Sequence, residues 1–182
     1  MLFRSKFNFK IYLLFIFLFT IVANSGFSQY DPNKMAKIKM KGIYIYQFAK
    51  NVNWPDNHFS ENFIIGVYGD QDLYNQLYKS YTDKLIGSQK IKVKFYNDLS
   101  KIIDSHLFFV SEEKNGNINK VIKILPPRTL LVSEGADLVS TGSIINFIYV
   151  QSSLKFQVNK TKAEKNDLKI GQQLQKLAYL TI

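Results

Sequence analysis

The sequence predicts a single α/β domain of three layers, with a mostly parallel sheet, helices on both faces of that sheet and an antiparallel hairpin near its C-terminus. Two observations lead to this fold class. Between residues 63 and 132, short runs rich in β-branched and aromatic residues alternate with segments whose apolar residues recur at helical spacing. Beyond residue 142 this alternation ends, and two β-rich runs flank a short polar turn.

The segment of residues 1–28 predicts a signal peptide. Arg4, Lys6 and Lys10 precede an apolar run at 11–23, which is shorter than the about 20 apolar residues that a membrane-spanning helix needs. Small residues follow this run, so we expect cleavage just before the domain at 29–182, which would then be periplasmic or secreted. An uncleaved membrane anchor is the alternative.

The composition narrows the classes of function. A domain of this length can bury about 68 to 70% of its unfolded surface, so it needs no metal or disulfide for stability. The sequence contains no cysteine, which excludes thiolate nucleophiles, cysteine-ligated zinc and iron–sulfur clusters. The formal net charge is +10 and falls to +7 when residues 1–28 are removed. Because the lysines are spread along the whole chain, we expect no nucleic-acid partner.

The first helix of the domain is expected from Asp31-Pro32 to about Val52. Asp at the N-cap accepts hydrogen bonds from free amides, and Pro at the first helical position lacks the amide that would go unpaired. Pro55 disfavours helical dihedrals at Trp54 and so explains the end of the helix. Apolar residues cover more than one stripe of this helix, which must therefore be buried on most of its girth or covered by a partner chain.

The middle of the chain is expected to hold the parallel part of the sheet. The runs at 106–110 and 129–132 are continuously apolar, as in strands covered on both faces. Pro126-Pro127 stop the helix between these two strands. The full set of expected elements in this region comprises strands at 63–68, 91–95, 106–110 and 129–132 and helices at 72–81 and 118–125.

The C-terminal part is expected to depart from this alternation. The runs at 143–150 and 154–158 predict the antiparallel hairpin, which makes the sheet mixed at one edge. A short turn at 160–165 is expected next, followed by a final helix whose apolar face includes Leu168, Leu174, Leu177 and Ala178. No repeat or linker is present, so one domain is expected.

Candidate catalytic residues are few. His58 and His106 are the only histidines, and they are too far apart for a metal-binding helix motif. His106 begins an apolar strand, so we interpret it as structural, although a hydrolase that uses it as a base is a further alternative. Glu112 and Glu113 are adjacent and therefore divergent, which disfavours glycosidase chemistry. We expect no enzyme activity, no metal site and no cofactor.

The exits of the strands are the remaining candidates for a binding site. In an open α/β sheet, ligands bind beyond the carboxyl ends of the strands, which here are 68–70, 111–112 and 133–135. Ser133 and Glu134 precede a flexible glycine and form the best candidate, with a capped strand exit as the simpler interpretation. Trp54 is either packed over the end of the core or partly exposed as an anchor for a partner.

A set of segments, in order along nearly the whole mature chain, supports a resemblance to a known family. The segments are 46–50 with Trp54-Pro55, 63–67, Gly87 with 91–93, 105–110, 131–134, Gly142 with 145–147, 156–159 and 168–170. In this ordered set the chain resembles the YfiR family.

The resemblance implies a periplasmic regulator without enzyme activity. Its best known members restrain a membrane-bound diguanylate cyclase by contacting the periplasmic sensor domain of that protein, and they tend to dimerise. Other members resemble companions of other membrane sensors, including histidine kinases. Ser105 stands where many members have cysteine, so the redox control associated with the best known members is not carried over to this chain.

The leading hypothesis is therefore an exported regulator that binds and restrains a membrane sensor. The alternative is a small-ligand-binding protein of the solute-binding type that uses the exits around Ser133 and Glu134, and the ligand could also be the signal. A homodimer is a further possibility. The candidate partner- or ligand-binding residues are Tyr46, Trp54, Ser133, Glu134 and Phe147.

Overall fold

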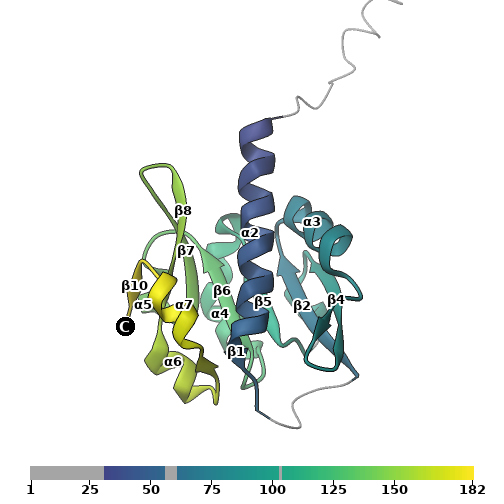
Figure 1. The fold of residues 1–182 in the computed structure, drawn as a ribbon, viewed down its shortest axis with the longest axis vertical. Coiled ribbons are helices and arrows are strands. Elements are labelled where there is room, and N and C mark those ends of the chain that lie inside the picture. Colours follow the sequence, from purple (N-terminus) through teal and green to yellow (C-terminus); the bar gives the residue numbers. More distant parts are fainter. Residues whose placement is uncertain (1–30, 56–60, 103) are drawn as a thin grey trace, which may run out of the picture. The chain divides into compact units, whose positions relative to one another are not determined.

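A computed structural model describes residues 31–55, 61–102 and 104–182. The predicted signal peptide and His58 lie outside the described residues. Residues 33–182 form one compact unit, to which the sheet and the helices that pack on it belong (Figure 1).

An eight-stranded sheet forms the centre of the domain, in the order β10-β8-β7-β6-β5-β2-β4-β3. Five consecutive strands of this sheet, β7-β6-β5-β2-β4, are parallel to one another. The hairpin β7–β8 is antiparallel, so the predicted fold class is confirmed. A short antiparallel strand at the other edge, β3, was not predicted. The strands are β2 (Asn62–Tyr68), β3 (Leu85–Ile86), β4 (Gln89–Tyr96), β5 (Leu107–Val110), β6 (Leu130–Glu134), β7 (Ile145–Val150), β8 (Ser153–Val158) and β10 (Leu180–Thr181).

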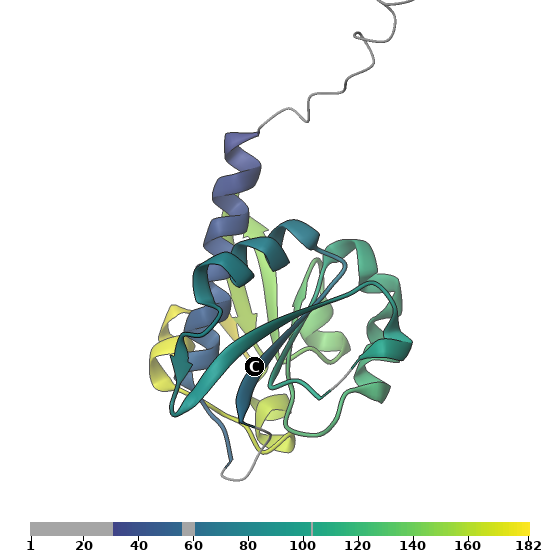
Figure 2. The ribbon, with the colours of Figure 1, turned by 90° about the vertical axis from the view of Figure 1, so that its right-hand side faces the viewer.

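Helices cover both faces of the sheet, as Figure 2 shows from the side. One face packs against α2 (Pro32–Asn51) and α3 (Gln71–Tyr81) in a core that includes Phe48, Leu77 and Phe109. The opposite face packs against α4 (Ile118–Ile124) and α5 (Leu138–Thr141) in a smaller core around Phe108. Two 3₁₀ helices, η1 (Leu99–Lys101) and η2 (Glu112–Asn117), complete the connections. Alternate residues of the buried strands therefore enter different cores.

The long helix α2 buries only one stripe of its surface. Its buried residues are Ile38, Lys41, Gly42, Ile45, Phe48 and Ala49, which recur at helical spacing. Trp54 follows the helix and packs edge-on against Phe63, while its indole N–H donates to the Ala49 carbonyl at 3.0 Å. Both predicted ends of the helix are confirmed within one residue. Within the described ranges, no helix is long and apolar enough to cross a membrane.

The C-terminal region corrects two predictions. Residues 160–165 form a helix, α6 (Lys160–Lys165), whose N-cap Asn159 accepts a hydrogen bond from the Lys162 amide at 2.7 Å. The predicted final helix is interrupted, because β9 (Lys169–Ile170) pairs antiparallel with β1 (Val52–Asn53) and leaves only α7 (Gln172–Leu177). Leu168 is buried outside any helix. Pairing of Ile170 with Val52, which lies 118 positions earlier in the chain, overrides the local helical spacing.

Candidate functional site

The order of the strands creates a crevice between β2 and β5. The chain leaves β2 toward α3 on one face of the sheet and leaves β5 toward η2 and α4, which pack on the other. Connections that depart to opposite faces leave the carboxyl ends of two adjacent parallel strands uncovered, and ligands bind at such switch points in α/β proteins. The exits of β2, β5 and β6 predicted from the sequence are thus brought together.

A cleft of about 380 Å³ lies at this edge of the sheet. That volume is within the range of small-molecule sites in proteins, which is roughly 300 to 1,000 Å³. One wall is the first half of α2, and the floor is formed by the strand exits. The residues that line it are Lys34, Lys37, Ile38, Lys41, Gly69, Asp70, Gln71, Asp72, Ser111, Glu112, Glu113, Glu134 and Tyr149.

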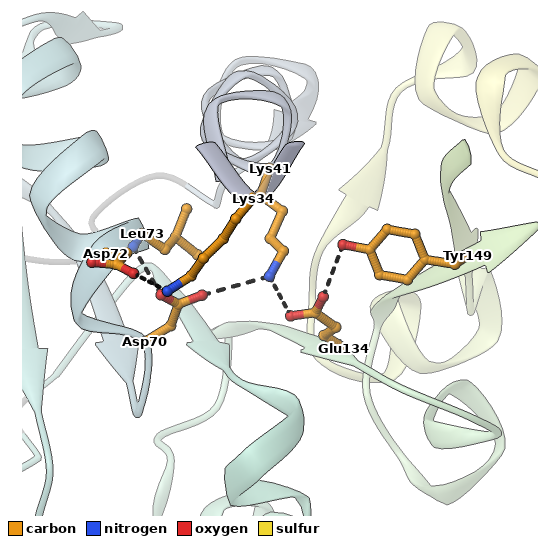
Figure 3. A network of polar contacts seen from close by, with 7 residues as sticks. All are labelled: Lys34, Lys41, Asp70, Asp72, Leu73, Glu134 and Tyr149. Carbon is orange, nitrogen blue, oxygen red and sulfur yellow. Dashed lines mark hydrogen bonds and ion pairs between the residues drawn. The ribbon is translucent and has the colours of Figure 1, made fainter. Parts of the chain in front are cut away.

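A buried lysine of α2 lies at the centre of the cleft (Figure 3). The ammonium group of Lys41 donates to Oε2 of Glu134 at 2.6 Å and lies 3.5 Å from Oδ2 of Asp70. The Lys41 and Glu134 side chains are 9% and 7% exposed. Charges this deeply buried are costly unless they are paired, so the contact fixes α2 to the end of β6. Asp70 is also the N-cap of α3 and accepts from the Leu73 amide at 2.9 Å.

Tyr149 closes the network at the other side of Glu134. Its hydroxyl donates to Oε1 of Glu134 at 3.4 Å, and the ammonium of Lys37 lies 5.1 Å from the centre of its ring. Burial of the phenol raises the pKa of Tyr149 to about 12, and the negative charge of Glu134 and the hydrogen bond to it add to the effect. The phenol therefore remains a neutral hydrogen-bond donor at physiological pH.

The floor of the cleft contains a hydroxyl without a partner. Ser111 is 4% exposed, and its Oγ forms no hydrogen bond with any residue that the structure describes. A side chain on Gly69 would collide with this hydroxyl, and the backbone there has φ of +87°. Glycine is thus needed at position 69 for two reasons. A buried polar atom without a partner has a desolvation cost that a bound ligand could offset.

The rim of the cleft is acidic. Lys34 pairs with Asp72 at 2.7 Å, a contact in which both side chains are well exposed. Glu112 and Glu113 begin η2, are exposed, and form no ion pair within residues 31–55, 61–102 and 104–182. The charged residues that line the cleft comprise three lysines and five carboxylates, so the cleft is formally negative in a protein of net charge +10.

A comparison with models of protein families shows which family the chain belongs to. The model of DUF4154, described as YfiR/HmsC-like, matches residues 38–179. The chain belongs to the YfiR/HmsC-like family. A search of curated proteins found no match. The resemblance inferred from the ordered segments is thereby confirmed. The family is regulatory and periplasmic and is associated with control of diguanylate cyclase signalling.

The sequence-predicted residues of this YfiR/HmsC-like protein do not all reach the cleft. Glu134 is at its centre, whereas Ser133 points into the opposite side of the sheet, where its Oγ donates to the Asn146 side chain at 2.8 Å. Tyr46 stacks on Tyr81 at 4.5 Å, away from the lining residues.

The two remaining candidates lie in or against the core. Phe147 is fully buried, with its ring 5.5 Å from that of Phe48. Trp54 is half-buried against the core and lies 5.9 Å from the ring of His106. His106 is 1% exposed and accepts a hydrogen bond from the Ile64 amide through Nδ1, which agrees with its structural interpretation. The binding roles of these candidates stay predictions.

Sequence reasoning missed Lys41 and Tyr149. Lys41 lies three residues after Ile38 and four before Ile45, so it falls in the buried stripe of the helix. A lysine in an apolar stripe is the signal that could have identified it, since lysine is almost never fully buried without a partner. Tyr149 carries no such signal, because its place beside Glu134 depends on the pairing of β6 with β7.

Proposed function

We propose that this protein is exported and binds the periplasmic sensor domain of a membrane signalling protein, either a diguanylate cyclase or a histidine kinase, which it restrains. Membership of the YfiR/HmsC-like family supports the regulatory part of this proposal. The observation that carries the binding part is an exposed apolar surface on α2. We call it the α2 surface and define it as Met35, Met40 and Ile43.

The α2 surface lies on the side of the helix opposite its buried stripe. Met35, Met40 and Ile43 are 39%, 44% and 37% exposed. At 100° per residue they span an arc that contains none of the buried residues of α2. Methionine side chains adapt their shape to a partner, and an amphipathic helix face is a common element in the recognition of grooves. Exposed lysines beside it, such as Lys39, would favour an acidic partner surface.

Calorimetric titration tests this proposal with the processed protein and the purified periplasmic domains of the cyclases and kinases of the same cell. We expect at least one domain to bind, and Met40→Asp with Ile43→Asp to weaken binding at least tenfold. The matched control is Ile124→Asp in α4, whose side chain is 47% exposed on the opposite side of the sheet. Absence of binding to every domain would refute the proposal, and equal losses in both variants would place the contact elsewhere.

A second candidate function is the binding of a small ligand, and the cleft favours it. The cleft lies at the switch point of the sheet, where ligands of α/β proteins bind. A thermal-shift screen tests it, because a ligand at 100 times its dissociation constant adds about 2.7 kcal/mol to the free energy of unfolding. The two functions are compatible, since α2 supplies both a wall of the cleft and the α2 surface.

A further inference from the structure

We propose that the cleft binds a small organic amine through its ammonium group. This inference rests on the second function proposed above and names the chemical class of the ligand. Three features of the cleft support it: the charge of the lining residues, the Ser111 hydroxyl, which has no hydrogen-bond partner among the described residues, and the acceptor groups of the lining.

The negative charge of the cleft favours a cationic ligand. Its five carboxylates exceed its three lysines, although the chain as a whole has a net charge of +10. Two of the lysines are engaged, Lys34 with Asp72 and Lys41 with Glu134 and Asp70. Glu112 and Glu113 have no such counter-ion among the residues described and lie on the rim. A cation that approaches this protein therefore finds an attractive field at the cleft and a repulsive one over the protein as a whole.

The hydrogen-bond groups of the cleft favour a ligand that donates several N–H hydrogen bonds. The Ser111 hydroxyl is buried in the floor and has no hydrogen-bond partner in the part of the chain that the structure describes; its oxygen can accept hydrogen bonds, and its O–H can donate one. Within the described part of the chain, the polar contact of Asp70 Oδ2 is with Lys41 at 3.5 Å, and that of Glu134 Oε1 is with Tyr149 at 3.4 Å. These long contacts leave acceptor capacity on both carboxylates. An ammonium group offers donors and no acceptor, which matches this set.

The same geometry disfavours a metal ion as the cation. Within the described residues, no group of three or more acidic or imidazole side chains could hold one. The Lys41 ammonium already lies between Asp70 and Glu134 and would repel a divalent ion at that point. An organic amine can keep its charge at the rim beside Glu112 and Glu113 while its carbon chain contacts the Tyr149 ring and Ile38.

The test compares three small molecules that share one carbon-chain length: putrescine, butanediol and succinate, which are cationic, neutral and anionic. Their binding to the processed protein is measured by calorimetry at one fixed ionic strength. We expect putrescine to bind and the other two not to bind. Glu112→Gln with Glu113→Gln should raise the putrescine dissociation constant about tenfold, the change that corresponds to about 1.4 kcal/mol. Ser111→Ala should raise it by a similar factor.

Glu164→Gln is the matched control, since Glu164 is an exposed carboxylate in α6 outside the cleft. It should leave putrescine binding unchanged. Equal weakening by Glu164→Gln would reveal general charge attraction and overturn the proposal.

The remaining outcomes of the titration distinguish the amine proposal from other ligand classes and from sensor binding. Binding of succinate or butanediol in place of putrescine would overturn the amine class and leave ligand binding intact. Binding of none of the three, with loss of sensor binding in the Glu112→Gln and Glu113→Gln variant, would overturn the proposal and assign the cleft to a side chain of a protein partner. Because the titration contains no sensor domain, its failure leaves the proposed sensor binding untouched.

Discussion

Lys41 of α2 and Glu134 of β6 form a buried ion pair with 2.6 Å between Nζ and Oε2, although 93 positions separate them in the chain. The pair ties the helix that carries the α2 surface to the carboxyl end of a central strand. Asp70, at the exit of β2, is the second carboxylate within reach of the same ammonium. One lysine thus connects three elements that are distant in sequence, and it does so in the cleft where we propose that a ligand binds.

Lys41→Met is expected to lower the free energy of unfolding by about 3 kcal/mol, because it leaves the Glu134 and Asp70 carboxylates without their buried counter-ion. Urea unfolding measures the change. Lys34→Met is the control, since its partner Asp72 and Lys34 itself are largely exposed and such pairs contribute at most about 1 kcal/mol. Equal changes in the two variants would mean that the Lys41 pair is not buried in solution.

Ser111→Ala is expected to leave the free energy of unfolding unchanged or to raise it by about 1 kcal/mol. The substitution removes a buried hydroxyl that has no hydrogen-bond partner among the residues described, together with its desolvation cost. Thermal or urea unfolding of the ligand-free protein checks this. A clear loss of stability would show that the hydroxyl has a hydrogen-bond partner in solution.

Tyr149 is expected to titrate later than an ordinary phenol. Its pKa is raised to about 12, first by burial and then by Glu134. Since the folded-state pKa exceeds the unfolded value of about 10, the contribution of Tyr149 to stability is complete below pH 10 and is lost as the pH rises through about 12. NMR of labelled tyrosines, assigned with Tyr149→Phe, measures the titration.

Glu134→Gln provides the matching test, because it removes the charge that contributes to the shift. The pKa of Tyr149 should then fall toward its usual value but stay above it, since burial remains. A pKa unchanged by Glu134→Gln would exclude the contact between these side chains.

Trp54→Ala is expected to cost about 3 kcal/mol of unfolding free energy, through the lost packing against Phe63 and His106. Trp54→Phe should cost about 1 kcal/mol, since it keeps an aromatic ring and loses the hydrogen bond to Ala49. Urea unfolding followed by circular dichroism gives both values. If Trp54→Ala proved neutral while sensor binding was lost, Trp54 would be an anchor for a partner and not part of the packing.

The prediction of the fold succeeded where local rules decide the structure. Asp31-Pro32 and Pro55 bracket α2 correctly because caps and prolines act through neighbouring atoms. The run at 106–110 was correctly assigned to a strand covered on both faces, because its apolar character is continuous, and β5 (Leu107–Val110) confirms it within one residue. The prediction of one continuous final helix was wrong because Lys169 and Ile170 pair with β1, a contact that no local sequence pattern indicates.

The candidate site was predicted in outline and not in its residues. The rule that ligands bind beyond the strand ends located Asp70, Ser111 and Glu134 correctly at one edge. It could not separate Ser133 from Glu134, which alternate between the two faces of β6 and enter different surroundings.

The amino-acid sequence by itself determined the fold class, the family and the alternation of strands and helices in the parallel part of the sheet, because these depend on periodicity, capping and ordered segments along one chain. Only the tertiary structure decided that Lys41 contacts Glu134 and that the Ser111 hydroxyl has no hydrogen-bond partner among the described residues. The physical reason is that burial and pairing depend on which distant side chains share a space. Sheet register and helix packing determine which side chains meet, and neither can be predicted from a short stretch of residues.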